Sequence, residues 1–391
     1  MYRYALLFAL ACVLCLPAFG ATTKVILNGN VVTLPVMDVD GKAFVDVVAL
    51  MKLLGGKCTY DAANAKLFIN AAGGGGGGTT ATGGGGGSTG TAQLAGDNGQ
   101  LAQVYSLDKL SPIFFRLVSA EFTVAQVVIG SELYAPLPGE KLLLLHFTVQ
   151  NPDKAIGRLA RNDVLRITAF DAMNNPHVCD SSWGDEGNHQ IVGVQLKPAQ
   201  TLACYCVLRV QAKGPIPKLM IQPSRDNNGP VLRYMFTDQI KALDAPFADP
   251  ADASGYTALD TIPAAIGTPY PFAKYTVTLE KFDFSTDPLG GANPPAGGRF
   301  LTATILVHNS SPDNVGLRDD HFLATLTDAD GIQMNWGGLV AASSGTVVDQ
   351  GLKTGAEMRV RLYFSVPKGS EPKTLVLQEG RFTHSYQFDV K

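Results

Sequence analysis

The chain contains the same long segment twice, and the second copy begins about 157 positions after the first. Residues 143–151 read LLLHFTVQN, and residues 301–309 read LTATILVHN in the corresponding place. Because the copies can be compared with each other, what both keep is interpreted as scaffold, and what one copy alone has is interpreted as drift or function. Further matches are Arg161-Asn162-Asp163 with Arg318-Asp319-Asp320, Asp171 with Asp328, Leu196-Lys197 with Leu352-Lys353, and residues 219–222 with residues 375–378.

Alternation of apolar and polar residues predicts strands in both copies. Every second residue from 143 to 149 is apolar, and so is every second residue from 301 to 307. A period of two with one buried face, in short segments separated by turns, is typical of a β-sandwich. We therefore expect a mainly β protein with two tandem immunoglobulin-like β-sandwiches, preceded by a small α+β module and a Gly-rich linker.

Bulk properties limit the function classes. A chain of 391 residues is long enough for two to four domains. A formal charge of −3 with 17% charged residues gives no electrostatic footprint for nucleic acid. We expect six segments: a signal peptide at 1–20, an α+β module at 21–70, a flexible linker at 71–99, a first sandwich at 100–242, a second linker at 243–267, and a second sandwich at 268–391.

The first twenty residues predict export. Arg3 precedes an apolar run at residues 5–16, and residues 17–20 (PAFG) end in a pattern typical of signal-peptide cleavage after Gly20. This run is too short to span a bilayer, which takes about 20 apolar residues. We expect no transmembrane segment in the mature chain and an extracellular, cell-surface or periplasmic location. Lipid attachment at Cys12 is the alternative to a free mature chain.

Residues 21–70 predict a small unit of strands and one helix. Strands are expected at residues 24–27, 31–36, 57–60 and 66–70, with Asn28-Gly29 as a hairpin turn. Residues 45–54 have apolar side chains at helical spacing and end at Gly55-Gly56. The following Gly73–Gly78 and Gly83–Gly87 runs predict a flexible coil that spans roughly 30 Å.

This unit resembles a known module. Residues 25–29 (VILNG), 39–45 (VDGKAFV) and 53–57 (LLGGK), followed by Tyr60-Asp61, resemble the copper amine oxidase N-terminal-like stalk domain. Val45-Asp46 departs from the Val-Pro usual in that family. The resemblance implies an accessory α+β unit of exported bacterial proteins. It does not imply oxidase activity, which belongs to a separate domain with copper-binding histidines and a modified tyrosine.

The two repeats resemble a second family. Residues 149–152 (VQNP) and 196–200 (LKPAQ) in the first copy carry the resemblance, with residues 326–331 (LTDADG) and 352–357 (LKTGAE) in the second. They are similar to the telokin-like, immunoglobulin-like extracellular domains of bacterial secreted proteins. The resemblance implies binding or spacer roles outside the cytoplasm and carries no ligand residues across.

One group of residues offers metal-binding chemistry, and only the first copy has it. Thiolate and imidazole ligands suit zinc or copper. Cys204 and Cys206 correspond to Val360 and Leu362, however, which favours burial in the core. Their spacing fits no closed zinc motif, so the group is more simply a set of buried thiols, with or without a disulfide from Cys179 to Cys204 or Cys206. The full group is His177, Cys179, Asp180, His189, Cys204 and Cys206.

Other candidate sites have simpler explanations. Asp328-Ala329-Asp330-Gly331 lacks the later ligands of a calcium loop and predicts a hairpin turn. Trp183 and Trp336 favour core packing over ligand stacking, and His146 is expected on an exposed sheet face. Outside the Gly-rich linker at residues 71–99, the sequence contains no Gly-x-Ser-x-Gly motif and no zinc-protease or Rossmann fingerprint.

We expect no catalytic residue, no cofactor and no enzyme activity. The expected function is that of an exported binding or spacer module, with a cell-wall polysaccharide or an envelope protein as partner. One alternative is a purely structural surface protein. The other is a metal-dependent enzyme that uses the Cys/His group of the first repeat.

Overall fold

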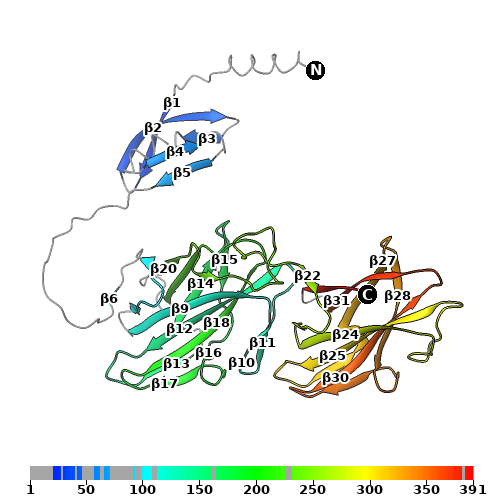
Figure 1. The fold of residues 1–391 in the computed structure, drawn as a ribbon. Helices are drawn as coiled ribbons and strands as arrows, with labels where there is room; N and C mark the ends of the chain where they lie inside the picture. The colour runs from blue at the N-terminus through cyan, green and yellow to red at the C-terminus, as the bar shows by residue number, and fades with distance from the viewer. Residues whose placement is uncertain are drawn as a thin grey trace, which may run out of the picture. The chain divides into compact units, whose positions relative to one another are not determined.

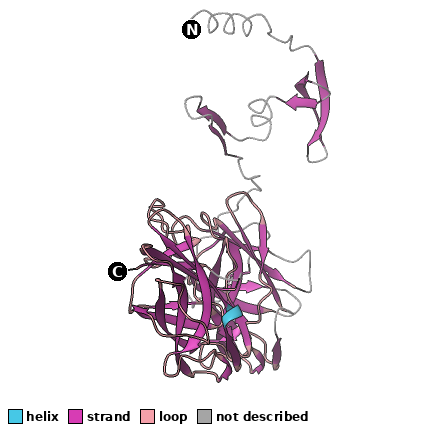
Figure 2. Ribbon diagram, turned by 90° about the vertical axis from the view of Figure 1, so that its right-hand side faces the viewer, coloured by secondary structure: helices cyan, strands magenta, loops and turns pink. Residues whose placement is uncertain are grey.

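The computed structural model describes the strands within residues 21–70 and 91–92, and residues 98–390 apart from 108–111, 161–163, 225–230 and 381–383. The chain divides into two compact units, Met1–Gly87 and Ser88–Lys391. In both Figure 1 and Figure 2 strands dominate the described residues, and their one helix is the short 3-10 element η2, Asp319–His321. The prediction of a mainly β chain is confirmed.

The N-terminal unit contains two antiparallel groups of strands. The first has the order β1 (Ala21–Leu27), β2 (Asn30–Val39) and β3 (Lys42–Val45). The second pairs β4 (Lys57–Asp61) with β5 (Lys66–Asn70). The four strands predicted from the sequence lie within these elements. The predicted Asn28-Gly29 turn and the helix at residues 45–54 lie outside the described residues.

The first repeat is a β-sandwich of two main sheets. One sheet has the order β16 (Gly184–Asp185), β18 (Thr201–Gln211), β12 (Glu140–Gln150), β9 (Ile113–Thr123), β8 (Tyr105–Leu107) and β6 (Thr91–Ala92), with β21 (Ile240–Lys241) beside β9. The other has the order β15 (Pro176–Val178), β14 (Leu165–Phe170), β19 (Lys218–Pro223), β20 (Leu232–Met235) and β7 (Asn98–Gly99). Two further antiparallel pairs accompany them: the hairpin of β10 (Val127–Ile129) with β11 (Glu132–Tyr134), and the pair of β13 (Gly157–Ala160) with β17 (Gly193–Leu196).

The second repeat builds its two layers from one continuous path of strands. Strand β28 (Gln333–Ala341) joins the layers, because it pairs with β27 (Phe322–Asp328) at its start and with β30 (Glu357–Val366) further on. The pair β26 (Val315–Arg318) and β29 (Asp349–Leu352) corresponds to β13 and β17 of the first repeat. The path has the order β22 (Thr261–Ala264), β32 (Ser385–Asp389), β31 (Pro372–Glu379), β27 (Phe322–Asp328), β28 (Gln333–Ala341), β30 (Glu357–Val366), β25 (Arg299–Asn309), β24 (Tyr275–Ser285) and β23 (Pro269–Pro271).

Residues shared by the two copies perform the same structural task in each. The Asn151 side chain donates to Ala155 O at 2.8 Å and to Leu196 O at 2.9 Å. Asn309 donates in the same way to Asp313 O at 2.9 Å and to Leu352 O at 3.0 Å. Each amide thus joins the turn after its own strand to the last residue of β17 or β29, as expected for a buried polar group that must be satisfied.

The copies also share irregularities. The pairing of β12 with β9 skips Val118, and the pairing of β25 with β24 skips Glu280 at the equivalent place. Asp171 accepts the backbone N–H groups of residues 173 and 175, and Asp328 accepts those of residues 330 and 332. These carboxylates close hairpins, so the turn predicted at residues 328–331 is confirmed.

The segment predicted as the second linker, residues 243–267, is packed against both sandwiches. Tyr256 and Ala258 lie in the first hydrophobic core, and Ile262 on β22 lies in the second. Phe247 contacts both cores. Since β22 pairs in parallel with β32, the connecting segment becomes part of the second sandwich.

A buried lysine holds this connection. Lys141 on β12 is fully buried, and its ammonium donates to Gly214 O at 2.7 Å, to Ala212 O at 3.2 Å and to Tyr256 O. It also lies 4.2 Å from the centre of the Phe122 ring. Burial lowers the pKa of this ammonium to about 8. Three carbonyl dipoles and an aromatic face compensate for part of the cost of removing the charge from water.

The Asn309→Ala substitution is expected to destabilise the second sandwich. It removes two buried hydrogen bonds to backbone carbonyls and should lower the free energy of unfolding by about 2–3 kcal/mol. Denaturant unfolding measures the change. Asn335→Ala, at an exposed position of β28, is the control and should change stability by less than about 0.5 kcal/mol. Equal effects of the two substitutions would contradict the assigned role.

Glu379 should make the stability of the second sandwich depend on pH. Its carboxylate is buried and accepts Lys274 N at 2.9 Å, and burial raises its pKa from 4.5 to about 7. The folded state therefore favours the protonated carboxyl. This preference adds about 3 kcal/mol to the free energy of unfolding. The added stability is complete below about pH 4.5 and is lost as the pH rises through about 7. Urea unfolding of wild type and Glu379→Gln across this range should show a fall for wild type that the variant lacks, and parallel curves would refute it.

Candidate functional site

The structure separates the Cys/His group predicted from the sequence into three places. Cys204 and Cys206 lie on the core-facing side of β18, as their counterparts Val360 and Leu362 indicated. Cys179 is buried in the same core, whereas His189 lies on the outer side of the sheet beside Tyr205. His177 on β15 points to the β14–β15 hairpin, where its Nε2 lies 3.5 Å from Asp171 Oδ2. These side chains do not share a common centre.

The three buried cysteines form a structural group. All three are free thiols, and the neighbouring Cys206 lowers the pKa of the Cys179 thiol. Cys179 Sγ also lies 3.4 Å from Ser181 Oγ, and Cys204 Sγ contacts Leu202 O at 3.9 Å. Of the two partners predicted for a disulfide with Cys179, the neighbouring Cys206 is favoured, and the disulfide itself stays a prediction.

Burial keeps the thiols of Cys204 and Cys206 protonated. It raises the pKa of Cys204 to about 12, with the carboxylates of Asp185 and Glu186 adding to the effect. Burial also raises the pKa of Cys206 well above its ordinary value. Since the thiolate is the form that binds metal and attacks electrophiles, the environment suits packing more than chemistry. Among the side chains that the structure describes, no three His, Cys, Asp or Glu residues form a group able to hold a metal ion.

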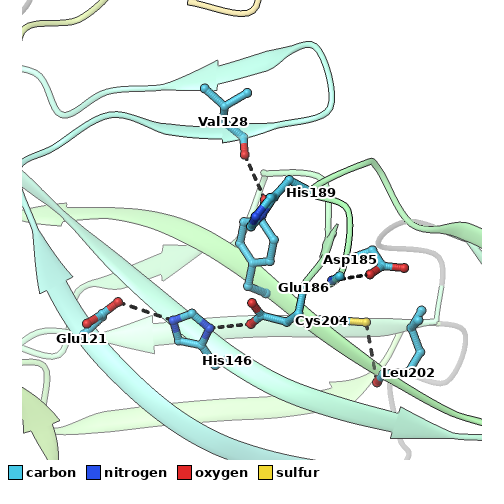
Figure 3. A network of polar contacts seen from close by, with 10 residues as sticks. Glu121, Val128, His146, Asp185, Glu186, His189, Leu202 and Cys204 are labelled. Atoms are coloured by element: carbon cyan, nitrogen blue, oxygen red, sulfur yellow. Dashed lines mark hydrogen bonds and ion pairs between the residues drawn. The ribbon is translucent and has the colours of Figure 1, made fainter. Parts of the chain in front are cut away.

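A polar cluster on the outer face of the first sandwich is the better candidate site (Figure 3). We call Glu121, His146, Glu186, His189 and Tyr205 the outer-face cluster. His146 Nδ1 lies 2.5 Å from Glu186 Oε1, and His146 Nε2 lies 3.4 Å from Glu121 Oε1. The His146 side chain keeps 26% of its surface exposed, between carboxylates that are 30% and 33% exposed. Instead of standing free on the sheet face, His146 is held between two acidic residues.

Tyr205 and His189 complete the cluster. The Tyr205 hydroxyl donates to Val128 O at 2.9 Å, and His189 Nδ1 lies 3.2 Å from the same hydroxyl. A phenol has one proton, so His189 Nδ1 must donate to the Tyr205 oxygen, which leaves Nε2 as an acceptor in the neutral ring. Burial raises the pKa of the Tyr205 phenol, and the negative charges of Glu186 and Asp185 raise it further.

The loop that carries Glu186 and His189 has an unusual backbone. His189 has φ = 58°, a left-handed conformation that disfavours side chains with a Cβ. The second repeat makes the same turn, in which Gly345 N donates to Ala341 O as His189 N donates to Asp185 O. There the left-handed residue is glycine, with φ = 68°. The first repeat thus keeps a histidine where glycine would fit better, and its ring meets Tyr205.

Four of the five cluster residues belong to the first copy alone, whereas Glu121 corresponds to Asp283 of the second. Strand pairing places Thr304 opposite Arg361 in the second repeat, where the first places His146 opposite Tyr205. Glu186 and Ala342 are equivalent, since each donates its backbone N–H to the same position of the neighbouring strand, Ala203 and Arg359. His146, Tyr205, Glu186 and His189 therefore stand where the second copy has a threonine, an arginine, an alanine and a glycine.

This arrangement suits hydrogen-bond donors and organic cations better than a metal ion. The two nitrogens of His146 point in opposite directions, each to its own carboxylate, so the ligands do not converge on one point. Lys241 Nζ lies 3.3 Å from Glu121 Oε2 and continues the chain of charges. The sequence reasoning missed this site because Glu121, His146 and Glu186 come from distant segments. A comparison of residues 184–189 with 340–345 would have given the one available signal.

The two tryptophans differ. Trp183 is fully buried and meets the Phe147 ring edge-on at 5.0 Å, so its core packing is confirmed. Trp336 is half-buried against Phe364 and lines a shallow groove of about 410 Å³ together with Asp319, Asp320 and Leu323. Among the described residues, no helix is long and apolar enough to cross a membrane.

Comparison with known proteins gives one family model and one solved structure. A family model described as a domain of unknown function, DUF4352, matches residues 264–386. No curated protein matches the chain. An uncharacterized β-sandwich protein from Clostridium difficile 630, known from a crystal structure, is 14% identical with a TM-score of 0.28, and the match covers 38% of this chain and 99% of that one. A likeness this low carries no argument about function.

Thiol-reactivity measurements should find all three described cysteines unreactive in the folded protein. Cys58 is first changed to serine, so that only Cys179, Cys204 and Cys206 remain in protein produced from residue 21 onward. The burial of all three thiols, together with the raised pKa of Cys204 and Cys206, predicts a very slow reaction with an aromatic disulfide reagent and reaction of all three after unfolding. A single fast thiol in the folded protein would contradict the structural role. Two thiols that appear only after reduction would identify a disulfide.

Proposed function

We propose that the chain is an exported, non-enzymatic protein of the cell envelope or extracellular space that binds a partner through the first sandwich. The residues before Ala21 support export. The strands of the N-terminal unit are compatible with an accessory stalk of the copper amine oxidase N-terminal-like kind, which the Gly-rich stretch would tether. The two repeats would act as an immunoglobulin-like, telokin-like pair outside the cytoplasm.

One observation carries the proposed binding role. The two copies have the same scaffold, but only the first has the complete outer-face cluster. In that cluster His189 has a left-handed backbone conformation, and its ring contacts the Tyr205 hydroxyl. A non-glycine residue in that conformation costs roughly 1–2 kcal/mol. Unfavourable local geometry that persists in only one copy supports a function at that place.

The chemistry of the cluster favours a partner rich in hydrogen-bond donors. Its two carboxylates are about one-third exposed, whereas the Tyr205 ring is buried beneath the β10–β11 hairpin and holds His189 in place. Carboxylates accept hydrogen bonds from hydroxyl, amide and ammonium groups. A cell-wall polysaccharide or a basic segment of an envelope protein offers these groups, and the polysaccharide is the first candidate.

A purely structural surface protein is the second candidate. It is supported by the internal pairing of the cluster, because both nitrogens of His146 already have partners. In that case the cluster would only fasten the loop at residues 185–190 to the sheet. The two candidates differ in whether a change at the cluster alters binding or only stability.

The test is a reversal of the first copy to the residues of the second. His146→Thr and Glu186→Ala are combined, which gives the first copy the residue types of Thr304 and Ala342, and Thr304→Ser in the second copy is the matched control. Sedimentation with purified cell-wall polysaccharide should show at least a tenfold loss of affinity in the double variant and none in the control. Mass spectrometry of protein from the medium and the envelope fraction should find chains that begin at Ala21.

Unchanged binding by a folded double variant would move the site away from the cluster. If wild type binds neither polysaccharide nor envelope proteins, the structural role would replace the binding role. Chains that keep residues 1–20 and stay inside the cell would contradict export.

A further inference from the structure

The place where the two sandwiches meet contains a buried histidine with an unusual set of partners. His384 directly precedes β32 and is 2% exposed. Its Nδ1 lies 2.7 Å from Leu259 O on the connecting segment, and its Nε2 lies 2.9 Å from Glu140 O at the start of β12. One imidazole ring thus joins the second sandwich to the first sandwich and to the segment between them.

Both partners of His384 are carbonyl oxygens, which only accept hydrogen bonds. A neutral imidazole has one N–H group and one lone pair, and both nitrogens donate only when the ring is an imidazolium. In the neutral ring, one nitrogen would direct its lone pair at a carbonyl oxygen less than 3 Å away. A buried acceptor–acceptor contact of this kind has no water to relieve it and is costly.

We propose that His384 is a pH-sensitive latch between the two sandwiches. The imidazolium donates to Leu259 and to Glu140 and holds the sandwiches together. Loss of one proton to solvent breaks one of these two hydrogen bonds and loosens the contact. The latch is independent of what the outer-face cluster binds.

The charged side chains on the segments next to His384 balance in number. The charged groups on the adjoining segments are Glu140, whose side chain lies 4.0 Å from Arg209, the buried Lys141, and the exposed Asp260. Asp260 accepts Gly139 N through Oδ1 at 3.2 Å, and its carbonyl accepts Ser385 N at 3.0 Å. Two acidic groups therefore accompany the two basic groups of the contact.

Neighbouring hydrogen bonds report on the state of the latch. Ser385 N and Gly139 N both donate to Asp260, and Ala258 N donates to Ala212 O at 2.9 Å. These amides cross between the same segments that His384 joins. If the latch opens, they should exchange with solvent faster, whereas the amides inside the central strand β25 should not change.

The first measurement is nitrogen NMR of the histidine rings in the full chain, with the His384 signals assigned by His384→Gln. The expected result is that both ring nitrogens of His384 are protonated in the folded protein at acidic pH, and that one loses its proton as the pH rises. A His384 ring with one unprotonated nitrogen at every pH at which the chain is folded would overturn the proposal. This measurement is made on wild type and does not require the variant to be stable.

The second measurement is hydrogen exchange against pH, corrected for intrinsic exchange. Protection of residues 256–262 should fall about tenfold as the ring is deprotonated, the effect of one lost hydrogen bond. The step should be absent in His384→Gln, whose folding is checked by circular dichroism against wild type. It should be present in the control His308→Gln, which changes a half-exposed histidine elsewhere in the second sandwich. No step in wild type, or the same step in His384→Gln, would overturn the latch.

Discussion

The ammonium group of Lys141 binds the connecting segment to the first sandwich, and that segment leads into the second sandwich. It joins β12 to the turn after β18 and to Tyr256 of the connecting segment by hydrogen bonds to backbone carbonyls. A charge in a fully buried position is costly unless every donor finds an acceptor, and here three carbonyls and the Phe122 ring supply the compensation. Removing the ammonium would leave those carbonyls unsatisfied. The backbone carbonyl of the preceding residue, Glu140, is a partner of the His384 ring. The first two residues of β12 therefore contact both the connecting segment and the second sandwich.

The duplication separates scaffold from candidate function. Asn151 and Asn309 make the same pair of bonds, the same β-bulge interrupts both sheets, and Asp171 and Asp328 close the same hairpin. Those features are needed by the fold, because each satisfies a buried or turn backbone group. The outer-face cluster is not needed by the fold, since the second copy makes the same loop with Gly345 and no histidine. Differences between the copies therefore locate the candidate site better than any single motif does.

The sequence predicted the sandwiches and the hairpin at Asp328 because these depend on local patterns. Alternation assigns one face of a strand to the core, which also placed Cys204 and Cys206 correctly through their counterparts Val360 and Leu362. The pattern could not show that the outer face of β18 is covered as well, where Tyr205 packs beneath the β10–β11 hairpin. It also gave no sign that residues 243–267, with a composition typical of a linker, place Tyr256 and Ile262 in two different cores.

The sequence by itself determined the duplicated, strand-rich architecture, since a period of two and turn residues at fixed offsets act within a few neighbouring positions. Only the tertiary structure decided that His146 lies between Glu121 and Glu186, that His189 reaches Tyr205, and that His384 faces two carbonyl oxygens. In each case the partners come from different strands or connecting segments and lie 16 to 244 residues apart along the chain. Their meeting depends on how strands pair and layers stack, and no local pattern carries that information.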